Sequence, residues 1–287
     1  MNRAYRGRFA PTPSGPLHFG SLVCALAGWL QARTQGGEWL LRIDDLDGPR
    51  VERDSVSEIP RQLEAHGLEW DGSILYQSSR YPQYLELLES LKEKGLAYPC
   101  HCSRKEIALD AKEGPEGLIY PGTCSITPSQ SRPFRMWRMK ALGQVEWRDL
   151  GLGLQKIKLE SQLGDFPLWR ADGIASYHLA TVMDEKLDRI TEIVRGEDLL
   201  FSSARHLYLQ QLLGHSLPRY LHLPLAKNLE GKKLSKKTQA PAMQLSQAGA
   251  NLQGAMKFLG LEPPLELATS TPNLLLPWAI DHWSPKT

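Results

Sequence analysis

The stretch of this sequence that decides the fold is RFAPTPSGPLHFGS, residues 8–21. Its three prolines exclude a helix or a central strand, because proline lacks an amide donor and has a fixed φ. Residues 22–33 then repeat apolar side chains at helical spacing, with Ser14 or Ser21 as candidate N-caps. The stretch therefore predicts a strand, a tight loop and the open N-terminus of a helix, where unpaired amides favour an anion.

Two residues of this loop suit a ligand. Gly20 lets a ligand approach the backbone closely, and His18 places an imidazole donor beside it. The same residues also fit a proline-rich turn that carries an incidental histidine. These residues alone do not distinguish a ligand site from such a turn.

Composition and charge narrow the class of protein. The chain has 287 residues, of which 41% are hydrophobic and 23% charged, as in an ordinary soluble protein of one large or two modest domains. The formal net charge is only +2, so contact with nucleic acid would depend on local basic patches. The sequence shows no apolar leader and no run of membrane-spanning length. We expect a cytoplasmic monomer with no membrane partner.

Strands and helices alternate in both halves of the chain, which predicts an α/β fold with a doubly wound parallel sheet. The acidic run 44–47 directly follows a predicted strand, where open α/β sheets bind ligands, although a solvated acidic turn would look the same. The predicted elements are strand 39–43, helix 55–66, helix 82–94, helix 175–184, strand 189–195, helix 202–213, strand 220–225 and a weaker helix within 242–259.

A cluster of cysteines interrupts the alternation. Because disulfides are rare in a reducing compartment, the spacing of Cys100, Cys102 and Cys124 favours a metal site over a disulfide. Three thiolates are one ligand short of tetrahedral zinc, and His101, a water molecule or Tyr120 could supply the fourth. Three ordinary buried thiols are the alternative.

Two motifs in a fixed order resemble those of the class I aminoacyl-tRNA synthetases. Residues 18–21, HFGS, look like the first signature of that family, and residues 233–237, KLSKK, look like the second. The wording RFAPTPSG at 8–15 and RIDD at 42–45 is similar to the glutamyl/glutaminyl branch. The resemblance covers about residues 6–237, most of the chain.

The two signatures depart from the family pattern at one residue each. Ser21 stands where the family has a second histidine, and it can donate a hydrogen bond but carries no charge. Lys237 stands in place of a serine, while the lysine position that the family needs, Lys236, is intact. Without the first motif, the second would be read as a solvated basic loop.

The resemblance implies a Rossmann-type α/β catalytic domain with a small zinc-binding insertion, a short helical C-terminal tail and no anticodon-binding domain. The implied divisions are 1–97 for the first half of the catalytic domain, 98–164 for the zinc-binding insertion and acceptor-side subdomain, 165–238 for the second half with the lysine loop, and 239–287 for the tail.

The resemblance also implies the chemistry and the residues. A carboxylate that attacks the α-phosphorus of ATP has to overcome repulsion between anions, so the family uses cations, helix amides and Mg²⁺ with the ATP. Arg8 or Arg195 can pair with the glutamate side chain, and Asp44 with Thr12 can accept from its ammonium group. The family usually has the longer glutamate at the position of Asp44. The implied residues are His18, Ser21, Lys233 and Lys236 for catalysis; His18, Gly20, Ser21 and Lys236 for ATP; Arg8, Ala10, Thr12, Asp44, Tyr177 and Arg195 for L-glutamate; and Cys100, Cys102, Tyr120 and Cys124 for structural Zn²⁺.

The acceptor follows from the resemblance and from what comes after the lysine loop. Residues 238–287 are too few for the helical region with which a glutamyl-tRNA synthetase reads the anticodon. This profile resembles the short branch of the family that transfers glutamate to queuosine at the wobble position of tRNA(Asp), so its partner would be that anticodon loop. The alternatives are charging of a tRNA 3′ end and a non-catalytic paralogue that binds tRNA or ATP.

Overall fold

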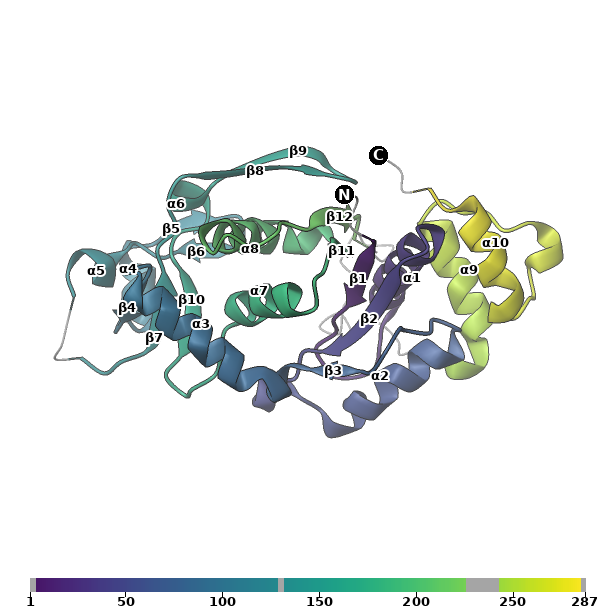
Figure 1. The fold of residues 1–287 in the computed structure, drawn as a ribbon, viewed down its shortest axis with the longest axis horizontal. Coiled ribbons are helices and arrows are strands. Elements are labelled where there is room, and N and C mark those ends of the chain that lie inside the picture. The colour runs from purple at the N-terminus through teal and green to yellow at the C-terminus, as the bar shows by residue number, and fades with distance from the viewer. Residues whose placement is uncertain (1–3, 129–131, 226–242, 285–287) are drawn as a thin grey trace.

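The computed structural model describes residues 4–128, 132–225 and 243–284 (Figure 1). Its centre is a set of parallel strands, in which β1 pairs with β2, β2 with β3, and β11 with β12. β1 lies beside β11, because Arg6 and Thr191 exchange backbone and side-chain hydrogen bonds at 2.8–2.9 Å. The strands are β1 Arg6–Phe9, β2 Glu38–Ile43, β3 Leu75–Tyr76, β4 Ala97–Cys100, β5 Lys112–Gly114, β6 Gly117–Ile119, β7 Met136–Met139, β8 Gln144–Asp149, β9 Gly153–Lys158, β10 Phe166–Arg170, β11 Glu192–Gly196 and β12 Arg219–Leu223.

Helices cover the parallel strands, so the predicted α/β class is confirmed. The helices expected near 22–33, 55–66, 82–94, 175–184 and 202–213 are all present with slightly shifted ends. The α-helices of the described residues are α1 Phe19–Thr34, α2 Arg53–Ala65, α3 Tyr81–Glu93, α4 Arg104–Asp110, α5 Thr123–Ile126, α6 Leu159–Gln162, α7 Tyr177–Leu187, α8 Leu200–Leu212, α9 Ala248–Phe258 and α10 Pro272–His282.

The C-terminal helices α9 and α10 pack on α1, at the right of Figure 1. Leu252 and Met256 of α9 and Leu275 of α10 are buried in one apolar cluster with Leu26 of α1. This segment therefore belongs to the core that supports the N-terminus of α1.

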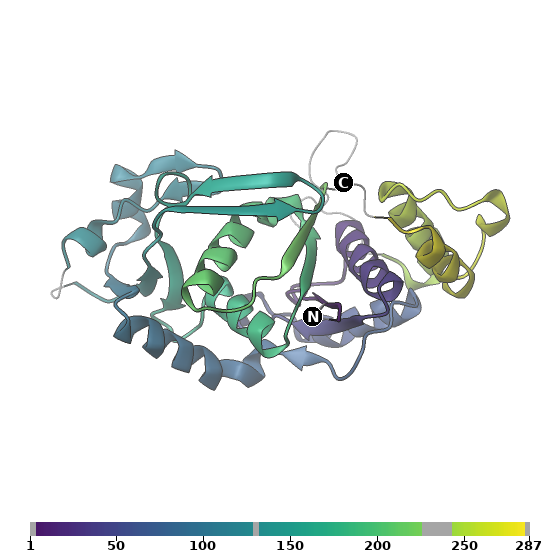
Figure 2. The ribbon, with the colours of Figure 1, turned by 45° about the horizontal axis from the view of Figure 1, so that its top comes forward.

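A second apolar core lies in the other half of the molecule, at the left of Figure 1. There α3, α7 and α8 pack against an antiparallel sheet of order β10-β7-β4. Strand β10, just after the expected end of the insertion at residue 164, pairs with β7 and not with the parallel strands. Figure 2 shows the long hairpin β8–β9 running past α8 toward β12. Within the described ranges, no helix is both long and apolar enough to span a bilayer.

Candidate active site

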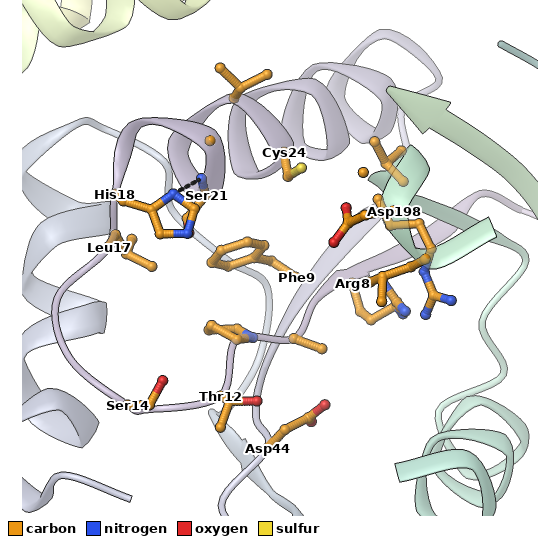
Figure 3. A pocket seen from close by; sticks show the side chains of 18 of the residues that line it. Arg8, Phe9, Thr12, Ser14, Leu17, His18, Ser21, Cys24, Asp44 and Asp198 are labelled. Carbon is orange, nitrogen blue, oxygen red and sulfur yellow. Dashed lines mark hydrogen bonds between the residues drawn. The ribbon is translucent and has the colours of Figure 1, made fainter. Parts of the chain in front are cut away.

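A pocket of about 580 Å³ opens at the carboxyl ends of β1, β2 and β11 (Figure 3). This is the edge at which parallel α/β sheets bind ligands. Its lining includes every residue expected to bind glutamate and, of those expected to bind ATP, each one that the structure describes. They are Arg8, Ala10, Thr12, Asp44, Tyr177 and Arg195 for the first set and His18, Gly20 and Ser21 for the second. Lys233 and Lys236 lie outside the described residues.

The proline-rich loop is fixed through its carbonyl groups. Pro11 accepts from the amide of Asp44 at 3.0 Å, and Pro13 accepts from the amide of Glu52 at 2.8 Å. Gly15 has φ 122°, a conformation that L side chains rarely adopt. The prolines thus serve as acceptors, and they hold the loop against β2 and the start of α2.

His18 caps the helix that follows the loop, which corrects the expectation that Ser14 or Ser21 would do so. Helix α1 begins at Phe19, and His18 Nδ1 accepts from the backbone amide of Ser21 at 3.2 Å. Because Nδ1 is an acceptor, the proton of the neutral ring is assigned to Nε2. His18 therefore offers an N–H donor beside the pocket while it holds the first turn of α1 (Figure 3).

On the β2 side of the pocket, buried charges are paired with one another. Arg42 Nε and Nη2 lie 2.7 and 3.3 Å from the two carboxylate oxygens of Asp44. Arg42 Nε is also 3.5 Å from Asp184, a carboxylate that accepts from Arg80 and Tyr84 as well. Burial raises the pKa of Asp44, and the pairing with Arg42 limits the rise. Asp44 thus reaches the pocket already held by an arginine.

Arg8 has a partner of its own. Its Nη2 lies 3.3 Å from Glu185 Oε1, and both side chains are buried. The other oxygen of Glu185 accepts from Gln210 at 2.9 Å. Burial lowers the pKa of Arg8, and Glu185 opposes that shift. Arg8 therefore faces the pocket as half of an ion pair.

Arg195 differs, because its hydrogen bonds end on neutral oxygens. Nη1 donates to Ser203 Oγ at 3.1 Å, and Nη2 donates to the hydroxyl of Tyr177 at 3.1 Å. Its guanidinium lies 5.6 Å from the ring centre of Tyr220. Within the described residues, no carboxylate lies at ion-pair distance from Arg195, which is 5% exposed. A buried guanidinium of this kind is suited to a planar anion.

Three of the four cysteines lie together near β4 and α5, at the opposite end of Figure 1 from α9 and α10. The sulfur atoms of Cys100, Cys102 and Cys124 are within 4.8 Å of one another, and all three are buried. The hydroxyl of Tyr120 is 3.5 Å from the sulfurs of Cys100 and Cys102. His101 has its Nδ1 on the carbonyl of Arg132 at 2.8 Å. Of the two side chains considered as a fourth ligand, Tyr120 is the one whose donor atom lies against the sulfurs.

Comparison with known proteins identifies the family. The model of the family "tRNA synthetases class I (E and Q), catalytic domain" matches residues 4–121 and 125–261. The chain belongs to this family. The class I resemblance read from residues 18–21 and 233–237 is thereby confirmed.

Curated relatives of this family align with nearly the whole chain. A protein of Dechloromonas aromatica (strain RCB) named glutamyl-Q tRNA(Asp) synthetase is 47% identical over 287 residues, 99% of this chain and 95% of its own length. A protein of the same name from Chromobacterium violaceum is 46% identical over 285 residues, again 99% of this chain and 95% of its length.

A solved structure gives the same fold. The glutamate tRNA ligase of Elizabethkingia meningosepticum, crystallised with its amino acid, superposes with a TM-score of 0.69 at 28% identity. The match covers 83% of this chain and 53% of the ligase, so the chain spans about half the length of that synthetase.

Sequence reasoning missed the residues that set the charge of the pocket. Arg42 belongs to the RIDD stretch, but that resemblance assigns it no role, and no sequence motif marks Asp184 or Glu185. A signal for Arg42 exists, since it stands in an otherwise apolar strand whose residues Trp39–Ile43 are all buried. A charged residue inside such a strand indicates a buried partner.

Proposed function

We propose that this chain activates L-glutamate with ATP, without tRNA, and then transfers the glutamyl group to queuosine at the wobble position of tRNA(Asp). The observation that supports the proposal is one pocket whose lining includes the residues expected for glutamate and, of those expected for ATP, His18, Gly20 and Ser21. The names of the two curated relatives support the choice of acceptor. The cytoplasm is the proposed location, because the acceptor is a tRNA.

The charges of the pocket support a specific pose for glutamate. Its side-chain carboxylate would pair with Arg195, whose present partners are the neutral oxygens of Ser203 and Tyr177. Its ammonium group would donate to Asp44 and Thr12, which lie near one another at the same side of the pocket (Figure 3). An arginine fork and a carboxylate at opposite sides select an acidic amino acid by charge as well as by shape.

The first step joins glutamate to AMP. An oxygen of the α-carboxylate attacks the α-phosphorus of ATP, and pyrophosphate leaves with Mg²⁺. His18 Nε2–H and the Ser21 hydroxyl would donate to phosphate oxygens at the N-terminus of α1, where the helix dipole favours negative charge. We assign Lys233 and Lys236 to the same transition state. In the second step a hydroxyl of queuosine attacks the glutamyl carbonyl, and AMP leaves.

The acceptor is tested with labelled glutamate, ATP and three purified tRNAs. We expect label on tRNA(Asp) that contains queuosine, and none on tRNA(Asp) with guanosine at the wobble position or on tRNA(Glu). Label on the 3′ end of tRNA(Glu) would instead indicate an ordinary charging enzyme. Binding of tRNA or ATP without glutamate-dependent pyrophosphate exchange would indicate a non-catalytic paralogue.

We also propose structural Zn²⁺ on Cys100, Cys102, Cys124 and Tyr120. The donor set fits the metal, since tetrahedral zinc with bonds of about 2.3 Å needs its sulfurs roughly 4 Å apart, and Cys102 Sγ and Cys124 Sγ are 3.4 Å apart. The guanidinium of Arg138 lies 4.0 Å from the ring centre of Tyr120 and would favour a bound phenolate.

The zinc proposal predicts one metal ion per purified chain under non-chelating conditions. Cys102→Ser should release it and loosen residues 98–125, because structural zinc contributes to local folding. Cys24→Ser, at a cysteine on α1, is the matched control and should retain the metal. Metal-free wild-type protein with an unchanged melting temperature would reduce the cluster to ordinary core thiols.

A further inference from the structure

A buried chain of hydrogen bonds runs behind Arg195 and ends in the hairpin β8–β9. Ser203 Oγ, which accepts from Arg195, lies 2.9 Å from His222 Nε2. His222 Nδ1 lies 2.5 Å from Asp149 Oδ2. Ser203, His222 and Asp149 are 0%, 1% and 2% exposed. Three elements that are distant in sequence, α8, β12 and β8, thus meet behind one pocket arginine.

The order serine, histidine, aspartate is that of a hydrolase triad, but the geometry serves another purpose. A nucleophile has to reach its substrate, whereas Ser203 Oγ is enclosed, accepts from Arg195 and lies 3.0 Å from the carbonyl of Leu199. The chain of bonds therefore acts on the arginine and not on a substrate carbonyl.

The donors and acceptors of this chain have one consistent order. Burial lowers the pKa of His222, against the effect of Asp149, so the ring is neutral near pH 7. Its Nδ1–H then donates to Asp149, and the one hydroxyl proton of Ser203 is shared between His222 Nε2 at 2.9 Å and the carbonyl oxygen of Leu199 at 3.0 Å. That leaves the lone pairs of Ser203 Oγ directed at Arg195.

The turn of the hairpin is shaped to hold Asp149 in this place. Asp149 Oδ1 accepts from the amides of Gly151, Leu152 and His222 at 3.0–3.1 Å, and the amide of Leu150 donates to Tyr220 O at 2.8 Å. A Cβ on Gly151 would lie 2.4 Å from the carbonyl oxygen of His222, so only glycine fits this contact. The turn is therefore docked on β12 with both oxygens of Asp149 engaged.

We propose that Asp149, His222 and Ser203 are positioning residues that orient the Arg195 fork for the glutamate side chain, with the β8–β9 turn as their anchor. This inference rests on the proposed function, because it assigns Arg195 to glutamate. Its consequence is selective: the chain of bonds should affect the use of glutamate and leave the use of ATP unchanged.

The test measures the KM for glutamate and the KM for ATP in pyrophosphate exchange. Ser203→Ala removes the oxygen that receives Arg195 and should raise the KM for glutamate about tenfold. Asp149→Asn favours the other tautomer of His222, whose Nε2–H donates to Ser203 Oγ. The hydroxyl proton of Ser203 then turns to Leu199 O, and Ser203 Oγ has to accept from His222 and Arg195 together, which should raise that KM by roughly threefold to tenfold. The KM for ATP should stay at the wild-type value in both variants.

Glu146→Gln is the matched control on the same hairpin, since Glu146 pairs with Lys156 at the surface, 3.0 Å away. It should leave both constants unchanged. If Asp149→Asn does not fold, as judged by circular dichroism, Ser203→Ala decides the matter. Suppose that the wild type is active and the variants fold. If their KM for glutamate is then unchanged, or if the KM for glutamate and the KM for ATP rise equally, this inference alone is overturned. A wild type without glutamate-dependent exchange would overturn the proposed function and this inference together.

Discussion

The two walls of the pocket each hold a buried arginine, but the arginines differ in the charge of their hydrogen-bond partners. On the β2 side, Arg42 is 1% exposed and is matched by the carboxylates of Asp44 and Asp184. On the β11 side, Arg195 is nearly as buried, but it is held by the hydroxyls of Ser203 and Tyr177. An arginine that is paired with carboxylates stabilises the packing of the elements that carry them. An arginine that is held by neutral groups can still form an ion pair with a ligand. The comparison assigns a structural role to Arg42 and recognition of the glutamate side chain to Arg195.

The largest expected effect concerns stability and tests the first half of this comparison. Arg42→Met leaves the buried carboxylates of Asp44 and Asp184 without their shared cation, so it should lower the free energy of unfolding by about 3–5 kcal/mol. Arg195→Met removes a charge that is not paired with a carboxylate, so it should change the free energy of unfolding by less than about 1 kcal/mol. Urea denaturation of both variants is the measurement, and equal losses would erase the distinction between the two walls.

The second effect concerns activity and falls on the other wall. Arg195→Met should lower kcat/KM for glutamate in pyrophosphate exchange by roughly 10²–10³, because the side-chain carboxylate loses its charged partner. Arg195→Lys should recover little of this, since a point charge cannot supply two parallel hydrogen bonds. A variant with near-normal kcat/KM would remove Arg195 from the glutamate site.

The third effect is a dependence of stability on pH, and it concerns His206, which is buried near Arg195 on the β11 side of the pocket. Burial, with Arg195 nearby, lowers the pKa of His206 well below its usual value. A histidine with a lower pKa in the folded state contributes stability that is present above its unfolded pKa near 6.5 and is lost as the pH falls below it. The loss due to His206 should be up to about 1.4 kcal/mol per pH unit.

Denaturation at pH 7, 6 and 5 measures this loss. His206→Asn should make the dependence on pH shallower, while His282→Asn, at an exposed residue of α10, should not. An identical slope in the wild type and His206→Asn would mean that His206 is protonated in the folded protein.

The smallest effect refines the account of Arg195. Tyr177→Phe removes one of the two oxygens that hold the fork and should raise the KM for glutamate about fivefold, as for the loss of one hydrogen bond of about 1 kcal/mol. Tyr81→Phe, at another half-exposed tyrosine of the same half, is the control. No change in Tyr177→Phe would leave Ser203 as the main support of Arg195.

The sequence was sufficient for most of the long helices, for strands β1, β2, β11 and β12, and for the edge at which the pocket forms. Prolines at 11, 13 and 16 followed by an apolar period of helical spacing mark a loop and a helix start, and both are local signals. The cap was predicted wrongly because three residues of the loop could serve as acceptors, and sequence alone does not show that α1 begins at Phe19.

The charge balance of the pocket could not be predicted in the same way. Arg42 and Asp184 are separated by 142 residues, and Arg195 depends on an aspartate in a hairpin that precedes it in the chain. Such pairings form only when elements that are distant in the sequence pack together, so the hydrophobic periodicity of a single helix or strand does not predict them. The roles assigned to Lys233 and Lys236 stay predictions, since these residues lie outside the described part of the chain.

The most direct test of the central claim is the preference for glutamate over glutamine in pyrophosphate exchange, measured for the wild type and for Arg195→Gln. The two amino acids differ in the side-chain group that Arg195 is proposed to bind. The wild type should prefer glutamate by roughly 10³-fold or more in kcat/KM, and Arg195→Gln should reduce that preference to about tenfold or less, mainly by losing activity with glutamate. A variant that keeps the preference of the wild type would contradict the claim that Arg195 receives the glutamate side chain.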